Sequence, residues 1–276
     1  MRIGLAQVDC ALGEVEANLE QAGKRIADAR AQDADLVIFP ELCLHGYQLG
    51  GVGDRSIAAA DPRLAALSEA GADVLMGFHE DDGMRAFNSA AYLSSGSLRH
   101  VHRKLYLPNY LVWEERKHAS PGQAMRAFDT RFGRMATLIC NDAWQPVLPW
   151  LAAQDGAELL LVPTNSATGF GPERLDTIEY WNDLLRFIAR IQQCWVLFCN
   201  RVGTEAGARF WGGSRIIGPD GEVVAQAPMF EPTVLVADID VPAARRRRRE
   251  IPLVAEARLG LIERELRRLI HEGGDA

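Results

Sequence analysis

The strongest constraint on the fold is an alternation between short β-branched runs and longer segments of helical periodicity. Residues 3–8 and 36–39 have the composition and length of strands, and residues 15–31 between them place apolar side chains at helical spacing. The chain therefore opens as strand, helix, strand. The alternation continues to residue 239 without a repeat or a flexible linker. This predicts one α/β domain over residues 1–276, with its strands between helical layers.

The rest of the chain divides into elements of the same two kinds. Helices are predicted at residues 64–70, 178–191 and about 254–270. Strands are predicted at residues 74–78, 89–93, 98–103, 135–140, 159–162, 196–200, 214–217 and 233–239. Residues 105–122 are rich in proline, asparagine and aromatic side chains and lack clean periodicity. They are predicted to form a long ordered loop, a kind of segment that often carries function.

Composition argues against two classes of partner. The formal net charge of −7 does not provide the broad positive surface that nonspecific nucleic-acid binding requires. No run approaches the roughly 18 uncharged apolar residues of a membrane-spanning helix, and the first ten residues resemble a strand rather than a signal peptide. These features favour a cytoplasmic protein. Residues 245–249 are five consecutive arginines, interpreted as a solvated segment before the C-terminal helix, although RNA, a membrane or an acidic protein stays open as a partner.

The cysteines and histidines give no metal signature. The five cysteines have no paired CxxC spacing, which favours free thiols in a reducing compartment. The six histidines show no HExxH spacing, so neither a metal nor a cofactor is expected. His102, which should face the same way as Lys104 on a strand, is interpreted either as a residue supporting the site or as a structural histidine. Cys43 and His45 offer a weaker alternative, a Cys-His nucleophile.

Two charged side chains follow apolar strands directly. Pro40 stops the first strand, so Glu41 falls at the sheet edge, where partial burial raises a carboxyl pKa toward that of a useful general base. Lys104 lies at the mouth of the long loop, where an ammonium lowers the pKa of a neighbouring thiol and stabilises an anionic intermediate. Taken alone, Glu41 also fits a surface residue or a helix cap, and Lys104 fits a surface lysine.

Cys140 ends a predicted strand and precedes Asn141 and Asp142, which commonly begin or cap a helix. A thiol at such a turn lies near helix N-terminal amides that favour both a thiolate and an oxyanion. The alternative is a buried structural cysteine. Together with Glu41 and Lys104, this thiol completes the set that acyl transfer requires: a base, a cation and a nucleophile.

The same three segments resemble the signature regions of the nitrilase superfamily, the carbon-nitrogen hydrolases. They are Phe-Pro-Glu at residues 39–41, His-Arg-Lys-Leu-Tyr-Leu-Pro at 102–108 and Leu-Ile-Cys-Asn-Asp at 138–142, in the order and approximate spacing of that family. The likeness extends to residues 3–7, 189–190, 200–203 and 211–214. It implies a four-layer α-β-β-α sandwich that commonly pairs with a second copy, with the C-terminal helix a candidate for the dimer interface.

The resemblance also implies roles by position. Cys140 would attack the substrate carbon, Glu41 would take and return the proton, and Lys104 would stabilise the oxyanion together with the backbone N–H of Asn141. Members of the family often use a second glutamate in the loop after the lysine. Residues 107–115 resemble that loop in the glutaminase domain of glutamine-dependent NAD synthetases, which favours Glu115.

Glu114 stays an alternative for the second glutamate. Candidate substrate contacts are the loop aromatics and polar side chains expected around the nucleophile: Tyr47, Tyr110, Trp113, Asn141, Trp144, Asn165, Ser166 and Phe170.

The resemblance predicts hydrolysis of a C–N bond in a small amide, with water as the second reactant. The loop after Lys104 favours a primary amide of glutamine-like chemistry, and nitriles and N-carbamoyl compounds stay alternatives within the family. Two other classes stay open, a catalytically silent binding or assembly protein and a thiol redox sensor. The first predicts an unreactive Cys140, and the second predicts a disulfide that forms at Cys140 under peroxide.

Overall fold

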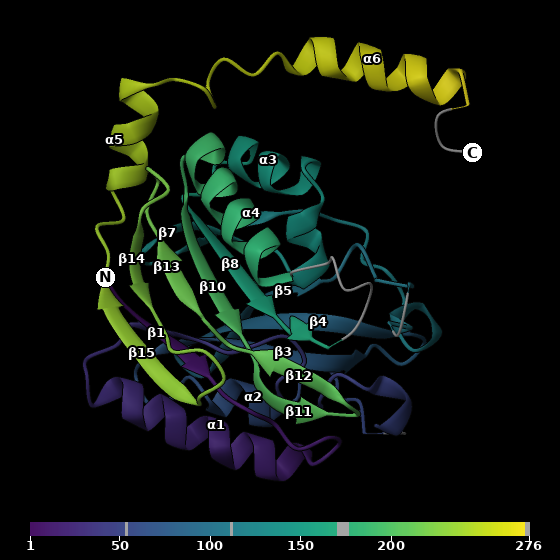
Figure 1. The fold of residues 1–276 in the computed structure, drawn as a ribbon, viewed down its shortest axis with the longest axis vertical. Coiled ribbons are helices and arrows are strands. Elements are labelled where there is room, and N and C mark those ends of the chain that lie inside the picture. The colour runs from purple at the N-terminus through teal and green to yellow at the C-terminus, as the bar shows by residue number, and fades with distance from the viewer. Residues whose placement is uncertain (53–54, 111–112, 170–176, 274–276) are drawn as a thin grey trace.

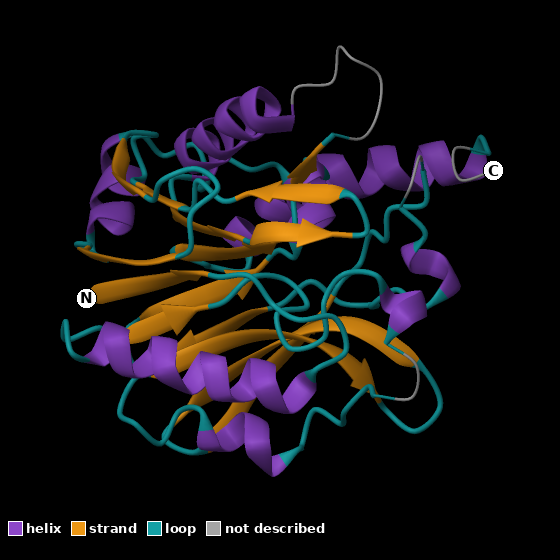
Figure 2. Cartoon of the chain, turned by 60° about the horizontal axis from the view of Figure 1, so that its bottom comes forward, coloured by secondary structure: helices purple, strands orange, loops and turns teal. Residues whose placement is uncertain are grey.

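The computed structural model describes residues 1–52, 55–110, 113–169 and 177–273, and two six-stranded sheets lie face to face in it (Figures 1 and 2). The first sheet has the order β15 (Thr233–Asp238), β1 (Arg2–Gln7), β2 (Leu36–Ile38), β3 (Asp73–Asp81), β4 (Ala86–Ser94) and β5 (Ser97–Arg103). The second has the order β14 (Val223–Gln226), β13 (Arg215–Ile217), β10 (Trp195–Asn200), β8 (Leu159–Thr164), β7 (Gly133–Thr137) and β6 (Ala127–Thr130). A small third sheet consists of β11 (Val202–Glu205), β12 (Ala208–Trp211) and β9 (Ala167–Thr168).

Helices cover the outer face of each large sheet (Figure 2). The α-helices are α1 (Val15–Arg30), α2 (Pro62–Ala66), α3 (Val147–Gln154), α4 (Thr177–Gln192), α5 (Ala243–Glu250) and α6 (Leu259–His271). Helix α1 buries Ile26 against the first sheet, and α4 buries Trp181 and Leu185 against the second. Leu5 and Leu197 belong to the apolar cluster between the sheets. The predicted four-layer α-β-β-α sandwich is confirmed.

Strand direction brings distant segments to one place. Strands β1, β2 and β3 are parallel, and β5 runs the same way as β3 because both pair antiparallel with β4. In the second sheet, β7, β8 and β10 are parallel. Hydrogen bonds join the residues that follow β2, β5 and β8, namely Glu41, Lys104 and Asn165. Segments that are far apart in the sequence therefore meet beyond the ends of their strands.

Gly77 on β3 allows the turn after β2 to pack closely against the sheet. A Cβ atom at this position would lie 2.3 Å from the carbonyl oxygen of Pro40 and 2.6 Å from the backbone nitrogen of Leu42. The N–H of Leu44 also donates to the carbonyl of Gly77 at 3.1 Å. Because any larger side chain would push this turn away, Gly77 helps to fix the backbone that carries Glu41.

The C-terminal region differs from the prediction in two ways. The arginine run is part of helix α5, and two of its side chains bind the body of the protein: Arg245 pairs with the buried Glu158, and Arg248 donates to the carbonyl of Ala157 at 2.6 Å. Helix α6 begins at Leu259 rather than near residue 254, and it extends away from the sandwich (Figure 1). Among the described residues, no helix combines the length and apolar character of a membrane span.

Candidate active site

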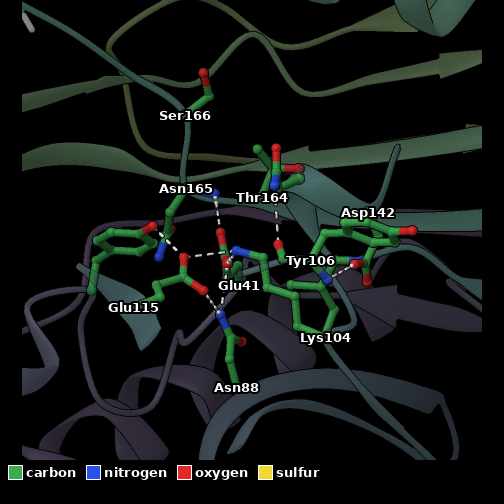
Figure 3. A network of polar contacts seen from close by, with 12 residues as sticks. Glu41, Asn88, Lys104, Tyr106, Glu115, Asp142, Thr164, Asn165 and Ser166 are labelled. Carbon is green, nitrogen blue, oxygen red and sulfur yellow. Dashed lines mark hydrogen bonds and ion pairs between the residues drawn. The ribbon is translucent and has the colours of Figure 1, made fainter. Parts of the chain in front are cut away.

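The buried ammonium of Lys104 is the centre of a polar network beyond the strand ends (Figure 3). Its Nζ lies 2.6 Å from Oε1 of Glu41 and 2.7 Å from Oε1 of Glu115, and both carboxylates are buried as well. Burial alone would lower the pKa of Lys104, but the two carboxylates raise it above its usual value. Lys104 therefore stays charged, and the three groups together carry one net negative charge when both carboxyls are ionised.

Glu41 is held by groups from three other segments. Its Oε1 accepts hydrogen bonds from Lys104 and from Nδ2 of Asn88 on β4, the latter at 2.8 Å. Its Oε2 accepts from the backbone N–H of Asn165, just after β8, at 2.9 Å. Glu41 therefore links the two sheets, and its orientation is fixed by three donors.

Of the two adjacent glutamates, Glu115 is the one that faces Lys104. Besides the lysine, it accepts hydrogen bonds from Asn88 at 3.3 Å and from the hydroxyl of Tyr47. Burial raises the pKa of Glu115 above its usual value, although the charge of Lys104 opposes this rise. Glu114 is exposed and pairs with Lys117 at 2.7 Å.

Cys140 opens a short 3₁₀ turn, Cys140–Trp144, in a backbone conformation that is rare for a residue with a side chain. Strand β7 ends at Thr137, three residues earlier than predicted, and Cys140 has φ = 46°. A left-handed φ at a residue other than glycine carries strain that the surroundings must hold, and such strain clusters at functional sites. The sequence predicted the position of this thiol at the sheet edge, but it did not predict this conformation.

The pKa of the Cys140 thiol is raised overall, although Lys104 lowers it, as the sequence predicted. Burial and the negative charge of Glu41 raise the pKa, whereas Lys104 and a hydrogen bond to the backbone N–H of Asn165 lower it by less. Burial is the largest of these effects, so it outweighs the opposing influence of Lys104. Burial thus favours the protonated thiol, and the charges of Glu41 and Lys104 both act on it.

Asp142 ties the cysteine turn to the segment that carries Lys104 (Figure 3). Its Oδ1 accepts from the N–H groups of Leu105 and Tyr106 at 3.0 and 2.9 Å. Its Oδ2 accepts from the N–H of Ile139 at 3.2 Å and lies 2.9 Å from Nε2 of the buried His102. The structure thus makes His102 a partner of Asp142 and keeps it out of direct contact with the lysine network.

Asn88 and the side chain of Asp142 were not predicted as site residues. Asn88 had one sequence signal, an amide side chain in β4, a strand whose other residues are apolar or serine. Such a residue needs partners when its strand is buried, and here the partners are Glu41 and Glu115. For Asp142 the signal was its place directly after the proposed nucleophile turn, which was interpreted as a helix cap.

The polar residues predicted to contact substrate have different surroundings. Asn165 is buried, and neither polar atom of its side chain has a hydrogen-bond partner among the described residues. The hydroxyl oxygen of Ser166, by contrast, accepts from the indoles of Trp181 and Trp211 at 3.1 and 2.9 Å. Nδ2 of Asn141 donates to the carbonyl of Tyr106 at 3.1 Å. Asn165 therefore has free hydrogen-bonding capacity beside Glu41.

The predicted aromatics divide between the site and its surroundings. Tyr47 and Trp113 meet edge to face, 5.1 Å between ring centroids, and both line a cavity of about 570 Å³ that also reaches Glu115. Tyr110 is 53% exposed, and the charge of Cys140 contributes to the rise of its pKa, after the larger effect of burial. Trp144 packs against the ring of Trp181 with centroids 5.5 Å apart. Phe170 lies outside the described residues.

A family model described as carbon-nitrogen hydrolase matches residues 2–249. This chain belongs to the carbon-nitrogen hydrolase family. As a member of that family it has relatives of several kinds. A glutamine-dependent NAD(+) synthetase of Thermotoga maritima is 31% identical over 247 residues, which are 87% of this chain and 42% of the synthetase. This chain thus spans less than half the length of that relative.

Two further relatives resemble this carbon-nitrogen hydrolase over most of their own lengths. An N-carbamoylputrescine amidase of Arabidopsis thaliana is 26% identical over 254 residues, which are 85% of each chain. The crystallised amidase of the nitrilase superfamily from Nesterenkonia AN1 is 25% identical, with a TM-score of 0.76, and the match covers 91% of this chain and 95% of that one. The family therefore includes amidases of about the same length as this chain.

Proposed function

We propose that this carbon-nitrogen hydrolase cleaves the C–N bond of a small primary amide through a thioester on Cys140. The observation that carries this proposal is the meeting of three segments in one network. Lys104 contacts Glu41 and Glu115, and Asp142 joins the turn that begins at Cys140 to the residues directly after Lys104. A nucleophile, a carboxylate able to take its proton and a fixed cation are the groups that acyl transfer needs.

The unpartnered side chain of Asn165 supports an amide as the substrate. It offers one acceptor and two N–H donors, which complement the donor and acceptor of a carboxamide. A buried polar group without a partner costs free energy, about 1–3 kcal/mol, so a ligand that satisfies it gains affinity. The relatives whose names carry glutamine or amidase agree with this class, and a glutamine-like primary amide is the first candidate.

In the proposed reaction, Glu41 removes the thiol proton while the sulfur of Cys140 attacks the amide carbon. Lys104 and the backbone N–H of Asn141 hold the resulting oxyanion. Glu41 then gives its proton to the nitrogen, the C–N bond breaks, and ammonia leaves a thioester. Glu41 next deprotonates a water molecule that attacks the thioester, and the thiol recovers the proton when the C–S bond breaks. The balance is amide plus water to carboxylic acid plus ammonia.

The test is a screen that measures ammonia and carbon dioxide together. Glutamine, short aliphatic amides, nitriles and N-carbamoyl amines should be incubated with the protein, and ammonia without carbon dioxide is expected from at least one primary amide. Carbon dioxide released in equal amount would move the substrate class to N-carbamoyl compounds, as the Arabidopsis relative suggests. Turnover of nitriles alone would contradict the amide proposal.

Glu115 and Glu114 provide a matched pair of adjacent carboxylates. Glu115→Gln should lower kcat by about a hundredfold, because it removes one of the two charges that hold Lys104 and changes the field at the thiol. Glu114→Gln should stay within about twofold of the parent, because Glu114 is exposed and bonds Lys117. Steady-state kinetics on the best amide measure both. Equal losses in the two variants would contradict the assignment of Glu115.

We also propose that the protein is a homodimer in which α6 packs on a second copy. None of its residues is buried, and Leu259, Leu266, Leu269 and Ile270 are all exposed. An isolated helix of 13 residues with an uncovered apolar face is marginal in water.

Sedimentation equilibrium should give a dimer for the parent chain. Leu266→Glu combined with Ile270→Glu should shift it toward the monomer, whereas Arg267→Glu is the matched control on the same helix. A monomeric parent chain would contradict the proposal.

A further inference from the structure

The carboxylate of Glu205 binds the loop that carries Tyr47. Glu205 ends β11, and its side chain is nearly covered, at 8% exposed. Its Oε1 accepts from two successive backbone N–H groups, those of Tyr47 at 2.9 Å and Gln48 at 2.7 Å. Gly46 has φ = 83°, and a Cβ atom on it would lie 2.7 Å from Oε2 of Glu205. The loop therefore reaches this carboxylate closely and in a conformation that suits glycine.

Glu205 is itself held by a buried arginine. Its Oε2 accepts from Nη1 of Arg201 at 2.8 Å, and Arg201 is 1% exposed. Nη2 of Arg201 also donates to Oδ1 of Asp9 and to the carbonyl of Cys10, both at 2.9 Å. Because the guanidinium is fixed by partners on a separate segment, Glu205 presents its other oxygen to the Tyr47 loop from a rigid position.

Tyr47 carries this restraint to the lysine network. Its backbone is bound by Glu205, and its hydroxyl donates to Oε1 of Glu115, the same oxygen that bonds Lys104. Figure 3 shows the dashed contacts that join Glu115 to the rest of the network. Glu205 reaches Glu115 through Tyr47, so its effect on the lysine network passes through that one side chain.

We propose that Glu205 is a positioning residue: it fixes the backbone of Tyr47, so that the Tyr47 hydroxyl keeps Glu115 on Lys104. The inference rests on the proposed amide hydrolysis and adds a residue outside the three proposed catalytic groups. It predicts that removing Glu205 lowers the chemical step more than substrate binding, because its hydrogen bonds go to the Tyr47 loop and to Arg201.

The decisive test is a double-mutant cycle between Glu205 and Tyr47. Glu205→Ala should lower kcat on the best amide by about tenfold and change KM by less than about twofold. In a Tyr47→Phe background the same substitution should lower kcat by less than about twofold further, because the hydroxyl it positions is already absent. A full tenfold loss in both backgrounds, or an unchanged kcat in the first, would overturn the proposal.

Two conservative variants keep the test independent of folding. Glu205→Gln keeps an oxygen that can accept from both N–H groups, so it should recover most of the kcat lost in Glu205→Ala. If the alanine variant does not fold, Glu205→Asp takes its place, because it keeps the charge beside Arg201 but withdraws the carboxylate oxygens by one methylene. This variant should lose less kcat than the alanine variant would. The loss should disappear in the Tyr47→Phe background. Persistence of that loss would overturn the inference. Glu16→Ala, which removes an exposed carboxylate paired with Arg63, is the control.

Alkylation of Cys140 by iodoacetamide separates this inference from the proposed function. The reagent is a primary amide, and its reaction reports the site without turnover. If Cys140 of the parent protein reacts no faster than free cysteine, the proposed function fails and the positioning role falls with it. If the parent reacts rapidly and Glu205→Ala equally so, only the positioning role fails. A several-fold slower reaction in Glu205→Ala supports it.

Discussion

Lys104→Met should lose about a hundredfold to a thousandfold in kcat, the usual cost of removing one group that stabilises an oxyanion. The methionine side chain has a similar length and can occupy the buried volume, so the loss would report the missing charge. The control is Lys117→Met, which removes an exposed lysine near the same loop. Near-normal turnover of Lys104→Met would refute the role assigned to Lys104.

The same substitution should also destabilise the fold, and the deficit should grow with pH. Glu41 and Glu115 would remain as buried carboxylates without their cation, and breaking a buried ion pair in this way costs about 3–5 kcal/mol. Burial already raises the pKa of Glu115, and Lys104 opposes that rise. Without Lys104 the folded-state pKa moves further above its unfolded value.

The sign of the pH effect follows from that shift. A group with a raised folded-state pKa contributes stability in its protonated form, and this contribution is lost as pH rises from the unfolded pKa through the folded one. Urea denaturation should therefore show a larger gap between Lys104→Met and the parent protein at pH 8 than at pH 5. A gap that shrinks with rising pH would contradict the burial of two uncompensated carboxylates.

Most helices and strands could be predicted because each layer of the sandwich imposes a periodicity on its own sequence. Helix α4 shows this well: its buried residues recur at helical spacing along a single face. The hairpin of β11 and β12 was missed, although Ala206 and Gly207, both with positive φ, form its turn. Those strands are only four residues long, so the alternation is too brief to be distinguished from a loop.

The predicted start of the C-terminal helix was wrong because apolar periodicity does not show which surface covers the apolar residues. Val254 packs against the core cluster beneath α3 and α4, and its carbonyl accepts from Nε2 of Gln154 at 3.1 Å. That segment is therefore attached to the body before α6 begins at Leu259. The sequence shows the apolar positions, but it does not show that some of them face the protein's own core.

The residue types at the strand ends predicted which side chains form the site, but they did not predict how the charges in the site balance. Glu41, Lys104 and Cys140 were all expected at the sheet edge, and the structure brings Glu41 and Lys104 into contact. That Lys104 would be shared between two carboxylates depends on the path of the long loop, which has no local signature, and on Asn88, whose only signal is a polar side chain within a strand. Lys104 lowers the thiol pKa as predicted, but burial and the charge of Glu41 outweigh it.

Cys140→Ala should abolish ammonia release, since no other group in the network can form the acyl intermediate. Cys140→Ser should retain little activity, because a hydroxyl gives up its proton far less readily than a thiol. The control is Cys10→Ala, which removes a thiol outside the network. Ammonia release by Cys140→Ala above the background of the assay would refute the nucleophile.

The five thiols also allow a direct test of Cys140 in the unaltered protein. Cys10, Cys43, Cys194 and Cys199 are buried, and burial raises the pKa of each, to about 12 for Cys10 and to about 11 for Cys194. Burial raises the pKa of Cys140 as well, but this thiol is only partly buried, and in the proposed reaction Glu41 accepts its proton. Brief treatment with iodoacetamide at pH 7.5 should therefore label Cys140 first, as measured by peptide mass spectrometry. Preferential labelling of any other cysteine would show that the carboxylate does not activate this thiol, and the proposed reaction would lose its first step.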